Sequence, residues 1–137
     1  MQALLKTALV VPVFNEATRW RERYWQEITS SGIAIYFVDD GSTDNTPQIL
    51  ANSNLGTLLK LEKNQGKSEA VRYGISEVLN SGLDFYQIGF IDSDCAFEIS
   101  EVIEIAENAP HHFNNGFDSV WTSRVRLAGH SISRTSF

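Results

Sequence analysis

The chain has 137 residues, of which 42% are hydrophobic and 20% charged, so it is long enough for one domain with a hydrophobic core and is not disordered by composition. A formal net charge of −6 argues against a non-specific nucleic-acid binder, which would need a basic face. The single cysteine, Cys95, cannot form an internal disulfide, which favours a reducing, cytoplasmic location, and we expect no membrane span in this chain.

Short β-branched runs alternate with segments of helical periodicity along the whole chain. Ala8 to Phe14 is a Val-rich run typical of a buried strand, whereas Lys67 to Leu79 carries an apolar stripe at helical spacing. Thr46 and Pro47 fit the cap and first position of a helix. The predicted elements are a strand over 8–14, a helix over about 18–30, a strand over 33–38, a helix from 46, a strand over 57–61, a helix over 67–79, a strand over 85–91, a helix over about 100–108 and a strand over 119–123.

The helix predicted after residue 100 takes Ser100 as its cap. It lacks a capping box, because Ile103 stands where Glu or Gln would be needed. We place its end near Asn108, so that His111-His112 falls in a loop after Pro110.

The alternation of strands and helices predicts an α/β fold, with a Rossmann-like, mostly parallel sheet covered by helices on both faces. In such sheets ligands bind beyond the carboxyl ends of the strands, at a topological switch point. Polar residues follow several predicted strands, so we expect one site along this edge. The sequence stops at Phe137 soon after a predicted strand, and we expect the protein to continue.

Asp92, Ser93 and Asp94 follow the strand predicted over 85–91. Carboxylate oxygens suit Mg²⁺ or Mn²⁺, and Mg²⁺ often combines one or two carboxylates with substrate phosphates. Such an ion could neutralise a leaving diphosphate. Asp and Ser are equally common in plain turns, so this pattern alone leaves a metal site and a solvated turn as equal alternatives. Cys95 has no base partner that the sequence identifies, and we expect no nucleophilic role.

A second acidic segment, Asp39-Asp40-Gly41-Ser42, follows the second predicted strand. Gly41 permits a tight turn, and a carboxylate at a strand end can accept a hydrogen bond from a nucleobase or a ribose. A plain strand-to-helix turn is the alternative. Two adjacent carboxylates repel each other and a turn needs only one, which favours ligand binding.

Three further segments are, each taken alone, better explained as ordinary structure. Pro12-Val13-Phe14-Asn15-Glu16 ends the first strand and could form a ledge for a base and ribose. Lys67 stands at a helix N-terminus, where anions are favoured, but Leu61 occupies the place of a P-loop's first glycine. Arg124 ends the last predicted strand, where it could bind phosphate.

Taken in this order, the segments resemble family 2 glycosyltransferases of the GT-A fold, over nearly the whole chain. Phe14 stands where Tyr is commoner in the family's first-strand motif, and Thr122 replaces Gly in a segment similar to that of members that glycosylate polyprenyl phosphates. The matching segments are 12–16, 38–46, 64–67, 92–94 and 122–124.

The resemblance implies that residues 1–137 are the donor-binding part of a GT-A enzyme. The enzyme would transfer a hexose, with inversion, from a UDP- or GDP-sugar and use Mg²⁺ or Mn²⁺. The acceptor would be a polyprenyl phosphate or a saccharide, and the full-length protein would associate with the cytoplasmic face of the membrane. The general base of sugar-accepting members would lie beyond Phe137.

The resemblance also implies roles for individual residues. These are base binding by Asp39, base and ribose contacts by Pro12 and Glu16, a place near the base and ribose for Lys67, ribose or metal contact by Asp92, metal ligation by Asp94, phosphate contact by Arg124, and further donor contacts by Val13, Phe14, Gly41, Ser42 and Ser93.

Two other functions stay open. A non-catalytic nucleotide-sugar-binding or interaction module would keep the fold without turnover. A nucleotidyltransferase would need a glycine-rich loop after the first strand, and residues 15–18 offer none, so we rank it last.

Overall fold

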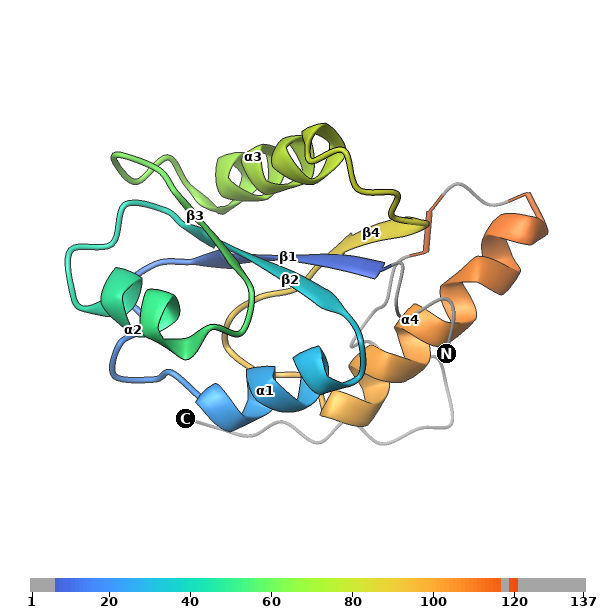
Figure 1. Cartoon of the computed structure of the whole chain (residues 1–137), viewed down its shortest axis with the longest axis horizontal. Helices are drawn as coiled ribbons and strands as arrows, with labels where there is room; N and C mark the ends of the chain where they lie inside the picture. The colour runs from blue at the N-terminus through green and yellow to red at the C-terminus, as the bar shows by residue number, and fades with distance from the viewer. Residues whose placement is uncertain (1–6, 117–118, 121–137) are drawn as a thin grey trace, which may run out of the picture.

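The computed structural model describes residues 7–116 and 119–120 of the chain. Its centre is a four-stranded sheet (Figure 1). All the pairings are parallel, and the strand order is β3-β2-β1-β4. The strands are β1 (Thr7–Val13), β2 (Ala34–Asp39), β3 (Thr57–Lys60) and β4 (Gln87–Phe90). The predicted parallel α/β sheet is therefore confirmed.

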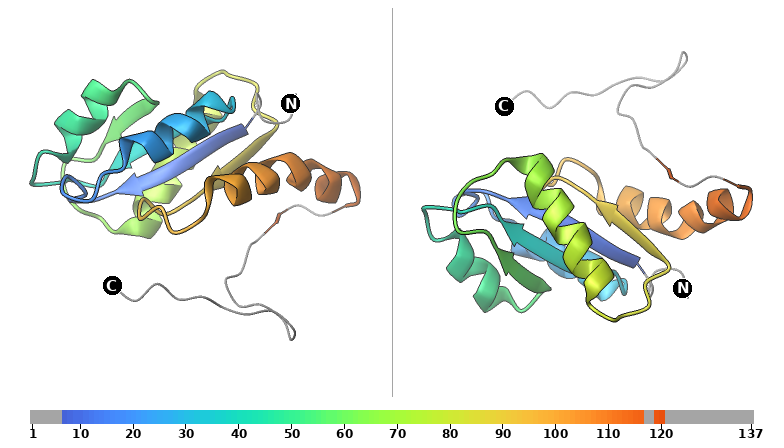
Figure 2. Two further views of the ribbon diagram at one scale, coloured as in Figure 1. Left: turned by 90° about the horizontal axis from the view of Figure 1, so that it is seen from below. Right: turned by 90° about the horizontal axis from the view of Figure 1, so that it is seen from above.

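Helices cover both faces of the sheet, as Figures 1 and 2 show. On one face lies α3, and on the other lie α1, α2 and α4. The helices are α1 (Glu22–Ser30), α2 (Thr46–Ser53), α3 (Lys67–Asn80) and α4 (Ile99–Asn114). None of the helices in the described part of the chain combines the length and apolarity needed to cross a bilayer.

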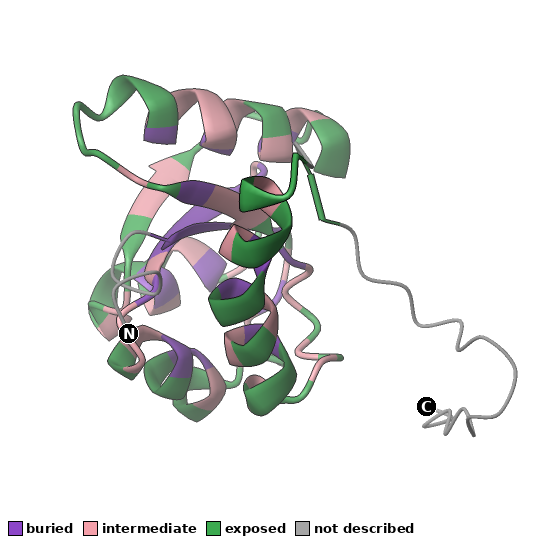
Figure 3. Cartoon of the chain, turned by 90° about the vertical axis from the view of Figure 1, so that its right-hand side faces the viewer, coloured by how far each residue is buried: buried purple, intermediate pink, exposed green. Residues whose placement is uncertain are grey.

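The side chains of β1 alternate between two hydrophobic clusters, because successive residues of a strand point to opposite faces. Val11 packs with Trp25 and Phe37 on the side of α1 and α4, while Val10 packs on the side of α3. Every residue of β1 is buried, and the buried segments lie between the layers in Figure 3. Since β1 is covered on both faces, it anchors the site that follows its end.

The first helix begins later than predicted, at Glu22 rather than near residue 18. The preceding residues form a turn, in which the Arg19 amide donates to the carbonyl of Glu16. Trp20 lies outside the helix, and its ring stacks on Trp25. The periodicity that suggested an earlier start therefore reflects packing of Trp20 onto the same cluster. Thr46, predicted as a cap, is the first residue of α2.

The fourth helix is longer than predicted and is capped differently. Glu98 is its N-cap and forms a capping box with Glu101, so the expectation of Ser100 as cap without a capping box was wrong. The helix continues through Pro110 and His111-His112 to Asn114; these histidines are helical and do not lie in a loop.

Pro110 lacks the amide that would bond the Ala106 carbonyl four residues earlier. In its place the Gln87 side-chain amide donates to that oxygen at 2.6 Å and to the Thr7 hydroxyl at 2.7 Å. A buried side chain from β4 thus satisfies the carbonyl that proline leaves free, and the helix does not stop.

The strand predicted over 119–123 falls mostly outside the described residues. The two residues that are described, Ser119 and Val120, are not in a strand.

Candidate functional site

A pocket of about 370 Å³ lies beyond the carboxyl ends of β1 and β4. The chain places β2 and β3 on one side of β1 and β4 on the other, so the pocket is at the switch point where such folds bind ligands. The pocket is lined by Pro12, Val13, Phe14, Glu16, Asp40, Asn64, Gly66, Lys67, Asp92, Ser93 and Asp94.

The structure brings most of the predicted site residues into this one pocket. Asp39, the last residue of β2, and Gly41 and Ser42 in the turn after it do not line the pocket, and Arg124 lies outside the described residues. Asp40, Asn64 and Gly66 do line it and were not predicted as site residues. The doubled carboxylate was a signal for Asp40, but the sequence did not show which of the two faces the pocket.

Each of the two adjacent carboxylates at the end of β2 has its own partner in the protein. Asp40 is 3% exposed, and its two oxygens accept from the amides of Gln65 at 2.7 Å and Gly66 at 2.9 Å. Asp39 accepts from the Ser42 amide at 3.2 Å. Asp40 therefore ties the end of β2 to the start of α3, which is a structural use of the doubled aspartate.

The segment after β1 is held against the segment after β2 by a set of backbone-to-side-chain hydrogen bonds. The amide of Asn15 donates to the Ser42 hydroxyl at 2.9 Å, and the amide of Glu16 to the Thr46 hydroxyl at 2.9 Å. The Ala17 amide donates to Asp44 at 3.2 Å. These contacts fix the position of the segment predicted as a base-and-ribose ledge relative to the turn after β2.

Hydrogen bonds, above all from the Thr46 hydroxyl, hold the pKa of Asp44 below its ordinary value. The amides of Thr46 and Ala17 act in the same direction. These donors from the segments after β1 and β2 therefore stabilise the charged carboxylate of Asp44.

Glu16 lines the pocket with its carboxylate already paired. It is buried, and Arg19 binds both of its oxygens, at 2.8 and 3.1 Å. This bidentate pair neutralises the charge of Glu16. Phe14, in contrast, is 42% exposed and presents an aromatic surface to the same pocket.

At the other side of the pocket, Lys67 forms an ion pair with Asp92. Lys67 is the first residue of α3, and Asp92 follows β4, so the pair joins two elements. The backbone near Asp92 is fixed, because the Ile91 amide donates to the Val10 carbonyl at 3.1 Å. Asp94 accepts from the Ala96 amide at 3.1 Å.

Asp92 and Asp94 fit a divalent cation of the Mg²⁺ type by their chemistry, since both are carboxylates and both line the pocket. Within the described residues no group of three or more His, Cys, Asp or Glu side chains is arranged to hold a metal. Two protein carboxylates leave coordination positions for substrate phosphates and water, which is how Mg²⁺ is usually held in phosphate-transfer sites.

Cys95 is a half-buried thiol next to Asp94, and burial is the main reason that its pKa is raised from 9.0 to about 11. Arg21 acts against this rise, while Asp94 and Glu16 add to it. The expectation that Cys95 is not a nucleophile agrees with this chemistry, since the thiolate is the reactive form.

We predict that Cys95 of the folded chain reacts with iodoacetamide at pH 8 roughly a hundredfold more slowly than in the denatured chain, because raising the thiol pKa from 9.0 to about 11 lowers the thiolate fraction at pH 8 by about that factor. Mass spectrometry of timed, quenched samples measures both rates. Equal rates in folded and denatured protein would contradict the prediction.

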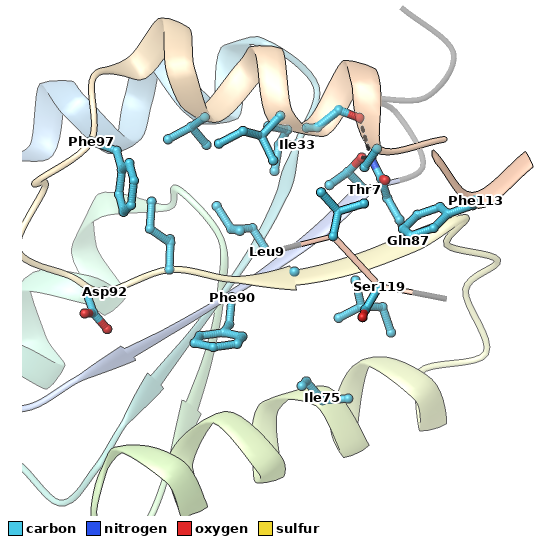
Figure 4. A pocket seen from close by; sticks show the side chains of 18 of the residues that line it. Thr7, Leu9, Ile33, Ile75, Gln87, Phe90, Asp92, Phe97, Phe113 and Ser119 are labelled. Atoms are coloured by element: carbon cyan, nitrogen blue, oxygen red, sulfur yellow. Dashed lines mark hydrogen bonds between the residues drawn. The ribbon is translucent and has the colours of Figure 1, made fainter. Parts of the chain in front are cut away.

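A second cavity, of about 490 Å³, runs along β4 between α3 and α4. Figure 4 shows Leu9, Ile33 and Phe97 on the α4 side and Phe90 and Ile75 on the α3 side. Most of its lining is apolar, and Lys67 and Asp92 line one end. This cavity therefore adjoins the polar pocket at the ion pair.

Comparison with known proteins places the chain in a family. The profile of Glycosyl transferase family 2 matches residues 8–129. The minor teichoic acid biosynthesis protein GgaA of Bacillus subtilis (strain 168) is 26% identical over 138 residues, covering 92% of this chain and 30% of GgaA.

Solved structures of S. aureus TarS share the fold. TarS 1–349 superposes with a TM-score of 0.57 at 23% identity, and its complex with UDP with a TM-score of 0.58 at 22% identity. Each match covers 78% of this chain and 33% of the TarS chain. The fold is therefore the GT-A fold, and the chain spans about a third of the length of these relatives.

Proposed function

The chain belongs to glycosyl transferase family 2, and we propose that it is the donor-binding part of an enzyme that transfers a hexose from a UDP-sugar. The observation that supports this most is the pocket at the ends of β1 and β4, where an aromatic ledge, a lysine and two acidic residues meet. The UDP complex of TarS, which has the same fold, supports UDP over GDP as the nucleotide.

The residues at the two sides of the pocket suit the two ends of such a donor. Phe14, Pro12 and Val13 offer apolar surface to the base. Asp39 stays the proposed hydrogen-bond acceptor for the base, and its burial beside the ledge would keep it oriented. Arg124 stays the proposed phosphate contact.

Asp92 and Asp94 would hold the divalent cation, Mg²⁺ or Mn²⁺. When bound, such an ion neutralises charge on the leaving nucleotide diphosphate and so assists departure from the anomeric carbon. The pocket favours this assistance, because its described lining keeps three carboxylates besides the Glu16 that Arg19 neutralises, against the single ammonium group of Lys67. An anionic diphosphate would be repelled there without a cation.

For the acceptor we propose a cell-envelope polymer of the teichoic acid type, on the basis of the relative GgaA. Polyprenyl phosphate is the second candidate, and it rests on Thr122-Ser123-Arg124. Activity with either acceptor, together with inversion at the anomeric carbon, would be assayed in the full-length protein with UDP-hexoses.

We predict that calorimetry will show binding of UDP in the presence of Mn²⁺, and that Asp94→Ala will weaken this metal-dependent binding by at least about 10-fold, because loss of a direct metal ligand should cost no less than loss of an outer-shell partner. Glu104→Ala, which removes an exposed carboxylate on α4, is the matched control and should bind like the wild type.

A folded wild-type sample that binds neither UDP nor GDP, with or without Mn²⁺, would refute the proposed function. The non-catalytic module differs in another way: its UDP binding would survive Asp94→Ala, and the full-length protein would transfer no sugar.

A further inference from the structure

Every carboxylate that lines the polar pocket has a partner within the protein. Arg19 binds Glu16, two amides bind Asp40, the Ala96 amide binds Asp94, and the ammonium of Lys67 binds Asp92. Four of these five partners are backbone amides or lie close in sequence: Arg19 and Ala96 stand within three residues of their carboxylates, and the amides that bind Asp40 belong to the backbone just before α3. The pair between Lys67 and Asp92 is different, because it crosses between α3 and β4 and both of its side chains are about half exposed, at 55% and 43%.

We propose that Lys67 is the counter-ion of Asp92 when no donor is bound. In this proposal the ammonium of Lys67 leaves Asp92 when the divalent cation and the diphosphate bind together. This inference rests on the proposed function, because it needs Asp92 and Asp94 to be the metal carboxylates. It assigns Lys67 a role in the order of binding, which goes beyond contact with the donor.

The positions of both groups support an exchange of this kind. Asp40 fixes the backbone immediately before Lys67 through the amides of Gln65 and Gly66. The base of the Lys67 side chain is therefore held in place, and only the side chain has to move. The lysine side chain is long and flexible, and its partial exposure lets it leave Asp92 without unfolding anything. Once released, the same positive charge is free to bind the anionic donor.

Charge explains why the exchange would couple metal to nucleotide. An ammonium on Asp92 both occupies the carboxylate and repels a divalent cation, so it weakens binding of the metal alone. A cation that arrives with a diphosphate brings a new partner for Lys67. Coupling between two binding sites is reciprocal. If Lys67 increases the factor by which nucleotide strengthens metal binding, it must increase by the same amount the factor by which metal strengthens nucleotide binding.

The alternative is a surface ion pair with no effect on binding, since exposed pairs are weak and screened by salt. The two alternatives differ in one measurable quantity, the affinity for the metal alone. An inert pair leaves that affinity unchanged when the lysine is replaced.

The test titrates Mn²⁺ into the full chain without nucleotide, following free Mn²⁺ by its electron paramagnetic resonance signal. We expect Lys67→Met to bind Mn²⁺ about three- to fivefold more tightly than the wild type, a size set by the weakness of half-exposed pairs. We also expect UDP to improve Mn²⁺ affinity less in this variant. Lys67→Arg keeps the charge and should behave like the wild type.

Lys60→Met is the matched control. Lys60 is exposed at the end of β3 and lines neither cavity, so this variant makes the same change in net charge away from the site. The double change Lys67→Met with Asp94→Ala should lose the gain in affinity, which shows that the ion binds at this site. Circular dichroism verifies that each variant is folded.

Equal Mn²⁺ affinity in Lys67→Met and Lys60→Met would overturn the inference, and it would leave the proposed function intact if the wild type still binds UDP with Mn²⁺. A wild type that binds no nucleotide would refute the proposed function instead, whatever the effect of Lys67 on the metal.

Discussion

Replacing Asp40 with alanine should lower the free energy of unfolding by about 4 kcal/mol, because the change removes two charge-assisted hydrogen bonds and leaves their donors without an acceptor. The carboxylate is buried and accepts from the amides of Gln65 and Gly66. Urea unfolding followed by circular dichroism measures the change. UDP binding with Mn²⁺ should weaken as well, since Lys67 follows these amides directly.

Glu62→Ala is the control for Asp40→Ala. Glu62 is an exposed carboxylate in the segment between β3 and α3, so its removal changes the net charge by the same amount without touching the two amides. We expect a change within about 0.5 kcal/mol. If Asp40→Ala destabilised the chain no more than Glu62→Ala, the link between β2 and α3 would not depend on this carboxylate.

Replacing Gly41 with alanine should destabilise the chain by about 3 kcal/mol, the sum of a left-handed backbone and a steric clash. Gly41 has φ of +69°. A Cβ atom there would lie 2.5 Å from the backbone of Lys63 and Asn64, and backbone cannot move aside as a flexible side chain can. Thermal and urea unfolding measure the loss.

Gly82→Ala separates the two causes. Gly82 has a similar φ of +74°, but an added Cβ atom would meet nothing within 4 Å. Only the backbone penalty applies, so we expect a loss of about 1 kcal/mol. Equal losses for Gly41→Ala and Gly82→Ala would show that the close approach of residues 63–64 has no energetic importance.

The sequence alone was sufficient to predict the layers of the fold. The Val-rich run of β1 and the apolar stripe of α3 are local patterns, repeating at intervals of two or about 3.6 residues. The acidic residues at strand ends were predicted to share one edge, and Asp92 and Asp94 do share a pocket with Glu16. Parallel strands all end at the same edge of the sheet, which is why these three residues meet, although Asp39, predicted for the same site, does not line the pocket.

Local patterns failed where a distant partner decided the outcome. The fourth helix continues past Pro110 because Gln87, on a strand 19 residues from Ala106, satisfies the carbonyl that proline leaves free. The helix N-terminus at Lys67 looked available to an anion, yet Asp40 already occupies the amides that lead into it. Nothing within one turn of either residue signals these contacts.

The doubled aspartate shows the same division between sequence and structure. The pattern alone was enough to predict that two carboxylates would stand where the second strand ends and that Gly41 would allow the chain to turn sharply there. Only the tertiary structure decided that Asp40 bonds residues 25 and 26 positions later, and that Lys67 meets Asp92. The physical reason is that the periodicity of a strand or helix depends on residues that are neighbours in the sequence. Contacts between separate elements depend instead on the order of the strands in the sheet.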